Sequence, residues 1–205
     1  MGRRLTPRGV QRRRELLDAA ARAFADDGYH TTSVTSVVGA LGVGKGVFYW
    51  YFDSKDDVMT AILVDAFNSM RDAQREAVAG EHDPGRRIEQ GIRSTLTWLS
   101  EHRHLFTLME FAHTDERFAP VVRRGEDQLI ADALPHVSAG VTAGLLRRED
   151  PVVLATAIFG VTAHLARKMM LERGEDAEAV AASVIAFCRD GYRASSVPIF
   201  ASRIA

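Results

Sequence analysis

The sequence predicts an all-α protein of about nine helices. Apolar residues recur at the three- and four-residue spacing of a helix along nearly the whole chain. Prolines that follow Thr or Asp mark expected helix starts, and glycines mark expected helix ends. Only Thr31 to Val38 looks strand-like, because it is rich in β-branched residues. The 205 residues, 46% hydrophobic and 26% charged, fit a soluble globular protein of one or two domains.

The first quarter of the chain is expected to hold three helices. The first starts at Thr6-Pro7 and stops at Gly28, and its apolar face comprises Leu16, Leu17, Ala20, Ala21 and Phe24. Two short segments follow, from about Ser33 to Ala40 and, after Gly42, to about Phe52. About 50 residues are marginal for a separate core, so we expect this unit to pack on the fourth helix.

The rest of the chain is expected to hold longer helices. Ser54-Lys55-Asp56-Asp57 resembles a capping box, with Asp in place of the usual Glu, and opens the fourth helix. Later helices should begin at Asp83-Pro84 and His102, and should span about Thr114 to Ala143, Asp150 to Glu172 and Asp176 to Arg193. Pro120 and Pro135 should start, bend or divide the segment that contains them.

Charge is distributed unevenly along the chain. Residues 1–55 carry nine Lys/Arg and five Asp/Glu, a net charge of +4, whereas residues 56–205 have a net charge of −5. Six arginines fall within the first fourteen residues. This split predicts that the first quarter meets an anionic partner. The arginines alone would also suit acidic lipid or a solvated tail.

The stretch from Gly39 to Gly46 nearly matches the phosphate-binding loop G-x-x-x-x-G-K-[S/T]. Gly46, however, replaces the Ser or Thr whose hydroxyl would hold the metal ion. Only twenty positions separate Lys45 from Asp65, the candidate magnesium ligand. No further strands are expected to build the parallel sheet that such a loop needs. A helix-turn-helix is therefore the favoured interpretation, and a P-loop-like nucleotide-binding enzyme stays the alternative.

Two short helical segments around a glycine turn have the outline of a helix-turn-helix. The second segment ends in five consecutive aromatic residues, Phe48 to Phe52. Successive helical residues lie about 100° apart, so these five side chains cannot all face the core. Phe48 and Phe52 are expected inside, and the three residues between them are expected to point partly outward.

The stretch from Thr32 to Lys55 resembles the TetR family of bacterial transcriptional regulators. The family pattern is a Gly-Val turn, then Lys-Gly, an apolar-Tyr-x-Tyr-Phe run, and Ser-Lys at the start of the fourth helix. Gly44 departs from this pattern, since the family often has Ser at this N-cap position. Val47 also departs, because a small hydroxyl residue is common there; it favours contact with a thymine methyl group instead.

The resemblance implies that the second segment enters the major groove of double-stranded operator DNA. Ser33, Tyr49, Tyr51 and Lys55 would hold phosphates, and Thr35, Lys45, Gly46, Val47 and Trp50 would lie nearest base edges. Arg3, Arg4 and Arg8 would form either a basic arm on the DNA or a solvated tail.

The resemblance also implies two domains, a helix-turn-helix domain over residues 1–55 and an effector-binding and dimerisation domain over residues 56–205. One short recognition helix reads few base pairs, so a homodimer is expected, formed through the helices at about 150–172 and 176–193. The candidate residues for lining an apolar effector pocket are Trp98, Phe106, Met109, Glu110, His113, Phe118 and Phe159.

The resemblance therefore implies a repressor that a small, mostly apolar effector releases from a palindromic operator. No catalytic constellation, metal-ligand spacing or cofactor motif is recognised, so we expect neither an enzyme nor a cofactor. The single cysteine, Cys188, suits the reducing cytoplasm, and no membrane partner is expected. A helical interaction protein without DNA binding is the second alternative.

Overall fold

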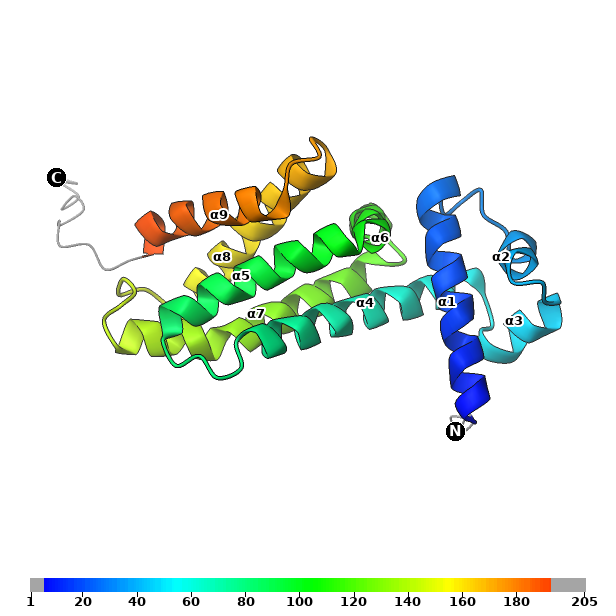
Figure 1. Cartoon of the computed structure of the whole chain (residues 1–205), viewed down its shortest axis with the longest axis horizontal. Helices are drawn as coiled ribbons and strands as arrows, with labels where there is room; N and C mark the ends of the chain where they lie inside the picture. Colours follow the sequence, from blue (N-terminus) through cyan, green and yellow to red (C-terminus); the bar gives the residue numbers. More distant parts are fainter. Residues whose placement is uncertain (1–5, 193–205) are drawn as a thin grey trace. The chain divides into compact units, whose positions relative to one another are not determined.

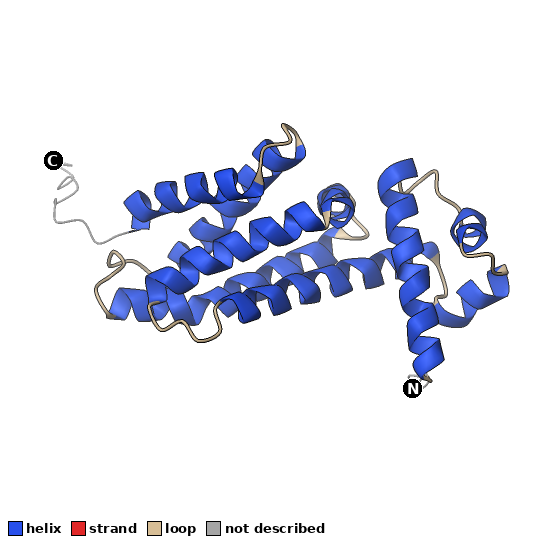
Figure 2. Ribbon diagram, viewed as in Figure 1, coloured by secondary structure: helices blue, strands red, loops and turns tan. Residues whose placement is uncertain are grey.

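The computed structural model describes residues 6–192, and within that range it contains helices and no strand (Figures 1 and 2). The predicted all-α class is confirmed for this part of the chain. The helices are α1 (Pro7–Asp27), α2 (Val34–Ala40), α3 (Lys45–Tyr51), α4 (Lys55–Ala77), α5 (Pro84–Glu101), α6 (Arg103–Thr114), α7 (Ala119–Thr142), α8 (Pro151–Leu165), the π-helical segment η1 (Ala166–Leu171) and α9 (Ala177–Tyr192). Arg3, Arg4 and residues 193–205, with the predicted helix end at Arg193, lie outside the described residues.

Short polar side chains fix the starts of several helices. The Thr6 hydroxyl accepts from the amide of Gly9 at 3.2 Å, and the Ser54 hydroxyl accepts from the amide of Asp57 at 3.0 Å. Asp83 and Asp150 cap α5 and α8 in the same way, at 2.8 Å each. Each bond satisfies an amide that the first turn of a helix leaves without a partner. The sequence signals for these starts are therefore confirmed.

The chain forms two compact units. The first comprises the residues up to Ser69 together with Glu101–Glu126, and the second comprises Met70–Ser100 and the residues from Asp127 onward. The predicted boundary at residue 55 separates a DNA-binding domain from an effector-binding and dimerisation domain, and it stays a prediction.

In the first unit, α1 packs on both α2 and α6. The predicted apolar face of α1 is buried, and so are the inward residues of α4, of α6 and of the α6–α7 connection: Leu16, Leu17, Ala20, Ala21, Phe24, Val58, Ile62, Phe67, Phe106 and Phe118. A core of this size supports the short helices α2 and α3, which seven residues each would not stabilise alone.

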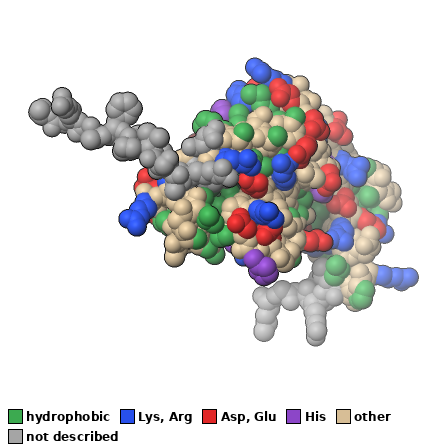
Figure 3. All heavy atoms as spheres, turned by 60° about the vertical axis from the view of Figure 1, so that its left-hand side comes forward, with side chains coloured by type: hydrophobic (Ala, Val, Ile, Leu, Met, Phe, Trp, Pro, Cys, Tyr) green, Lys and Arg blue, Asp and Glu red, His purple; other side chains and the backbone are tan. Residues whose placement is uncertain are grey.

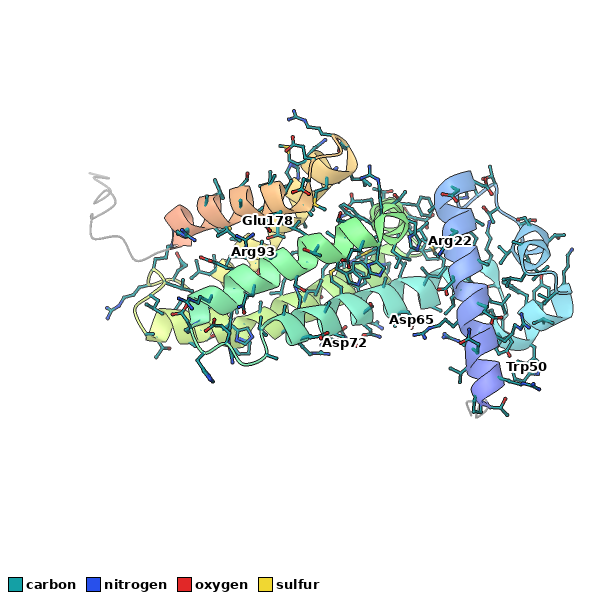
Figure 4. The ribbon with its side chains drawn as sticks, viewed as in Figure 1. Arg22, Trp50, Asp65, Asp72, Arg93 and Glu178 are labelled. Atoms are coloured by element: carbon teal, nitrogen blue, oxygen red, sulfur yellow. The ribbon has the colours of Figure 1, made fainter. Side chains whose placement is uncertain are left out.

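In the second unit, α5 and α9 run antiparallel, since Arg93 pairs with Glu178 and Glu89 pairs with Arg189 (Figure 4). Arg71 on α4 donates through two nitrogens to Asp132 on α7, at 2.8 and 3.0 Å. On the face drawn in Figure 3, acidic, basic and apolar side chains are interspersed.

Three local details were left open or missed by the sequence patterns. Pro135 lies inside α7, which continues to Thr142 without a break. Proline has no N–H, so Pro135 cannot donate to the carbonyl of Ala131. Both residues are exposed, so this carbonyl faces water. The last turns before Glu172 form the π-helical segment η1, which no sequence pattern indicated. The stretch from Thr31 to Val38 looks strand-like in sequence but is not a strand, because its residues from Val34 onward belong to α2.

Candidate nucleic-acid interface

A tight glycine turn joins α2 to α3. Gly42 has a φ of 63°, a left-handed conformation that glycine adopts without steric cost. The amide of Val43 donates back to the carbonyl of Val38 at 3.1 Å, which closes the end of α2. Val38 and Phe48 are buried on either side of the turn, so the two helices form the predicted helix-turn-helix.

The start of α2 is held by a reciprocal capping box. The Ser33 hydroxyl accepts from the amide of Ser36, and the Ser36 hydroxyl accepts from the amide of Ser33, each at 3.1 Å. Ser33 was expected at a phosphate, and here it also fixes the first turn of α2. Thr35, two residues later, is exposed.

Helix α3 separates its aromatic residues between the core and the solvent. Phe48 and Phe52 are 1% and 6% exposed, whereas Tyr49 and Trp50 are 54% and 49% exposed. Tyr51 is half-buried. The predicted inward and outward directions are confirmed, and α3 therefore carries a face on which large aromatic side chains meet solvent.

The first turn of α3 adds a charge and a glycine to this face. Lys45 and Gly46 are exposed, and Val47 is half-buried. Gly44 is the N-cap, and no side chain caps this end of the helix. Four exposed residues of α3 are separated by one or four positions and therefore share one face of the helix: Lys45, Gly46, Tyr49 and Trp50.

Lys55, at the start of α4, is engaged with backbone rather than free in solvent. Its ammonium group donates to the carbonyl of Tyr29 at 2.6 Å and to the carbonyl of Thr32 at 3.0 Å. It also lies 4.2 Å from the centre of the Tyr29 ring, and burial lowers the pKa of this lysine. Lys55 therefore ties the α1–α2 connection to α4, a role that sequence reasoning missed.

Tyr29 is the centre of a cluster that sequence reasoning also missed. Its hydroxyl donates to Asp56, and its ring stacks on Phe111 with a centroid separation of 5.5 Å. Burial and the bond to Asp56 raise the pKa of the Tyr29 phenol. The only sequence signal was an aromatic residue directly after the Gly28 stop.

Arg117, in the connection between α6 and α7, completes this cluster. Its guanidinium donates to Asp115 at 2.8 Å and to Asp56 at 3.2 Å, and it holds the pKa of Asp115 below its usual range. It also lies 4.9 Å from the centre of the Phe118 ring. These contacts join α4, the α1–α2 connection and the α6–α7 connection within the first unit.

The candidate effector residues divide between the two units. Phe106 and Phe118 are buried in the first unit, Met109 and Glu110 are half-buried, and the His113 side chain is 57% exposed, 3.6 Å from Glu126. Trp98 is buried and Phe159 is half-buried in the second unit. Neither unit contains all seven candidate residues, and their contact with an effector stays a prediction.

The comparisons with known proteins point to one family. The family model described as "Bacterial regulatory proteins, tetR family" matches residues 16–62, a range that contains every residue predicted to contact DNA in the two short helices and at Lys55. The HTH-type transcriptional regulator YdgC of Bacillus subtilis (strain 168) is 24% identical over 183 residues, which is 87% of this chain and 91% of that protein. The HTH-type transcriptional repressor KstR2 of Rhodococcus jostii (strain RHA1) is 37% identical over 78 residues, 38% of each chain.

Solved structures show the same fold along most of the chain. The fatty acid degradation regulator FadR from Bacillus halodurans superposes with a TM-score of 0.82 at 18% identity, over 92% of this chain and 98% of that one. PfmR from Thermus thermophilus, a TetR family transcriptional regulator, superposes with a TM-score of 0.72 at 22% identity, over 85% and 97%. Residues 16–62 thus match the tetR family model over the helix-turn-helix, and the regulators that the chain resembles along most of its length support a DNA-binding transcriptional regulator.

Proposed function

We propose that the protein is a repressor that binds a palindromic operator as a symmetric homodimer and is released by a small, mostly apolar effector. The observation that carries the DNA-binding part is the face of α3, where Lys45, Tyr49 and Trp50 are all exposed. Among the relatives, KstR2 is a repressor, whereas FasR of Mycolicibacterium smegmatis, 32% identical over 92 residues, is an activator. The sign of regulation is therefore part of the proposal.

The proposed DNA contacts fall into two classes. Phosphate contacts set the position of the protein and do not read sequence, and base-edge contacts read sequence. We assign Ser33, Tyr49, Tyr51 and Lys55 to phosphates, and Thr35, Lys45, Gly46, Val47 and Trp50 to base edges. Lys55 has three donors, of which two are used on carbonyl oxygens, so its third N–H is the one that would face a phosphate.

The proposed dimer face lies on α8 and α9. Val152 and Val153 on α8 and Phe187 on α9 are each at least half exposed. One helical stretch among the described residues, Pro151–Leu171, is long and apolar enough to cross a membrane by length and composition, and most of it is not buried. A second copy of this chain, rather than lipid, is the partner we propose for this face, because the family resemblance implies a dimer formed through these two helices.

The proposed effector is apolar because most of its candidate contacts are apolar. Five of the seven candidate residues are aromatic or Met, and Glu110 and His113 are the polar residues that would orient a ligand. FadR from Bacillus halodurans is described as a regulator of fatty acid degradation. Fatty acids are therefore the first class of compound to test. Because bacterial operators lie in the cytoplasm, we also place the protein there.

Selection from a random-sequence duplex library tests the proposed function. The wild-type protein should enrich a palindrome whose half-sites lie about 34–36 Å apart, or a multiple of that distance. In gel shifts on that palindrome, Lys45→Ala should relax sequence preference, whereas Tyr49→Phe should weaken the selected and a scrambled duplex alike. Failure to enrich any sequence would contradict the proposal, and equal loss on both duplexes after Lys45→Ala would contradict the role of Lys45.

A further inference from the structure

Arg87 on α5 is a half-buried cation without a carboxylate partner in the second unit. Its Nη1 atom lies 3.4 Å from Nδ1 of His136 on α7, and its Nε atom donates to the carbonyl oxygen of Glu81. Among the described residues, no carboxylate oxygen lies within 4.0 Å of its guanidinium, whereas the half-buried Arg71 pairs with Asp132 at 2.8 Å. Removing an unpaired charge from water costs free energy, so this cation favours an anionic partner.

The acidic residues around Arg87 are bound to other groups. Glu81 and Asp83 direct their carboxylates to backbone amides at or just before the start of α5, at distances between 2.8 and 2.9 Å. Asp132, one turn before His136 on α7, binds two arginines of α4 at 2.8 and 3.1 Å. Arg87 therefore keeps an uncompensated positive charge, although residues 56–205 have a net charge of −5.

His136 adds a neutral imidazole to this cation. A guanidinium has only N–H donors, so its contact makes Nδ1 of His136 the acceptor and leaves the ring proton on Nε2. Burial, followed by the charge of Arg87, lowers the pKa of His136, and Asp132 opposes the shift. Three of the five guanidinium N–H groups have no partner, and such a planar fork matches the two oxygens of a carboxylate.

The side of α5 that carries Arg87 continues toward an apolar residue. Gly91 and Trp98 follow four and eleven positions later, so the helical repeat places them within about 40° of Arg87 around the axis. Trp98 is buried, and a Cβ atom on the half-buried Gly91 would meet nothing within 4 Å. At a rise of 1.5 Å per residue, Arg87 and Trp98 lie about 16 Å apart along the helix. An apolar chain that starts at Arg87 would therefore pass open space beside Gly91 and reach an indole.

We propose that Arg87 and His136 form an anion site that binds the carboxylate end of the effector, whose apolar chain runs along α5 toward Trp98. This inference rests on the proposed release of the protein by an effector, and it names the effector class as an amphipathic monocarboxylate rather than a neutral apolar compound. A free inorganic anion has the same head-group chemistry, so the test separates these two sources.

The test measures ligand binding to the full-length chain by isothermal titration calorimetry. The probes are dodecanoate, dodecanol, which has the same chain without the charge, and inorganic phosphate, each below any concentration at which it aggregates. Arg87→Met removes the cation, and Arg86→Met is the matched control, because Arg86 is the exposed neighbour and carries the same charge. Circular dichroism reports whether each variant is folded.

The wild-type protein should bind dodecanoate about tenfold or more tightly than dodecanol, because only the carboxylate makes charge-assisted hydrogen bonds to Arg87. Arg87→Met should lose this preference and bind dodecanol as the wild type does. Arg86→Met should bind both compounds as the wild type does. Arg87→Lys keeps the charge without the planar fork, so its affinity for dodecanoate should lie between those of the wild type and Arg87→Met.

Equal wild-type affinity for dodecanoate and dodecanol would overturn the inference, and so would unchanged dodecanoate binding by a folded Arg87→Met protein. If Arg87→Met does not fold, wild-type affinity in Arg87→Lys overturns it instead. Phosphate that binds as tightly as dodecanoate and displaces it would overturn the assignment to an effector and make this a site for a free anion.

Selection of a duplex is measured separately from ligand binding. A protein that enriches a palindrome but binds no dodecanoate loses this inference and keeps the proposed DNA binding. A protein that binds dodecanoate through Arg87 but selects no sequence keeps the anion site and loses the proposed function.

Discussion

The ammonium group of Lys55 donates to the carbonyl oxygen of Tyr29 across 2.6 Å, although the two residues are 26 positions apart. A second bond, to Thr32, places the same lysine at the end of the α1–α2 connection. Lys55 therefore links the start of α2 to α4, and its remaining N–H is the donor that we propose for a DNA phosphate. The two roles can be separated by measurement.

Replacement of Lys55 by Met should affect both folding and DNA binding. The free energy of unfolding should fall by about 1–3 kcal/mol, because two carbonyl oxygens lose a charged donor. The slope of log affinity against log salt should fall by about 1, because one phosphate contact is lost. Denaturant unfolding and gel shifts at several salt concentrations measure the two effects.

Lys168→Met is the matched control for the Lys55 variant. Lys168 pairs on the surface with Glu172 at 2.8 Å, so its removal takes away the same charge without leaving buried carbonyls unpaired. It should cost less than about 1 kcal/mol and leave the salt slope unchanged. If Lys55→Met also leaves the slope unchanged, Lys55 only positions the helices and does not contact a phosphate.

Gly125 is expected to tolerate no side chain. A Cβ atom on Gly125 would lie closer than 3.0 Å to three ring carbons of Phe67, inside the first unit. Gly125→Ala should therefore lower the free energy of unfolding by about 1–3 kcal/mol through overpacking. Gly91→Ala, where space is open, should instead raise it by about 0.4–1 kcal/mol. Stability equal to or above wild type in Gly125→Ala would contradict the close packing of α4 on α7 at this point.

Local patterns predicted most helices and much of the DNA-binding face. The helical spacing of about 100° per residue was enough to place Phe48 inside and Tyr49 and Trp50 outside. Thr6, Asp83 and Asp150 marked helix starts because a cap acts on amides two or three residues away. Helix faces and caps depend on residues only a few positions apart, so they can be predicted from the sequence alone.

Contacts between distant segments could not be predicted. Lys55 matches the family pattern, which predicts only a phosphate contact for it. Its two carbonyl partners lie 23 and 26 residues away, so no local pattern points to them. The pairing of Arg117 with Asp56, 61 residues apart, has no local signal either. For the same reason the seven candidate effector residues were chosen by residue type, and spacing could not show that they divide between two units.

His136 should make stability depend on pH. Burial, with a smaller contribution from Arg87 3.4 Å away, lowers the pKa of His136 below its ordinary value of 6.5, while Asp132 opposes the shift. The unfolded chain therefore binds a proton more readily than the folded protein does, so stability rises with pH. The contribution is fully present above about pH 6.5 and is lost as the pH falls toward the lower, folded-state pKa.

His136→Gln removes this titration and keeps a polar side chain of similar size. Denaturant unfolding of both proteins at about pH 7.5 and about pH 5.0, on either side of the ordinary histidine pKa, measures the effect. The loss of stability between the two pH values should be smaller in the variant than in the wild type. His104 has its pKa lowered by burial as well, so the variant should retain part of the dependence. An equal loss in both proteins would mean that His136 does not carry this dependence.

Phe187 tests the proposed dimer. Its side chain on α9 is 63% exposed, and Val153 on α8 is 53% exposed. A symmetric interface uses the same patch on both subunits, so one substitution introduces two changes at the interface. Phe187→Glu should therefore convert the dimer to monomer in sedimentation velocity and weaken binding to the full palindrome far more than to a single half-site.

Val64→Glu is the control for this change. Val64 is 44% exposed on α4, outside the proposed face, so a glutamate there should leave the sedimentation coefficient and palindrome binding as in the wild type. Circular dichroism should show that both variants keep the helical content of the wild type, because Phe187 and Val64 are exposed. A Phe187→Glu protein that still sediments as a dimer would place the dimer face elsewhere and leave the exposed apolar residues of α8 and α9 to another partner.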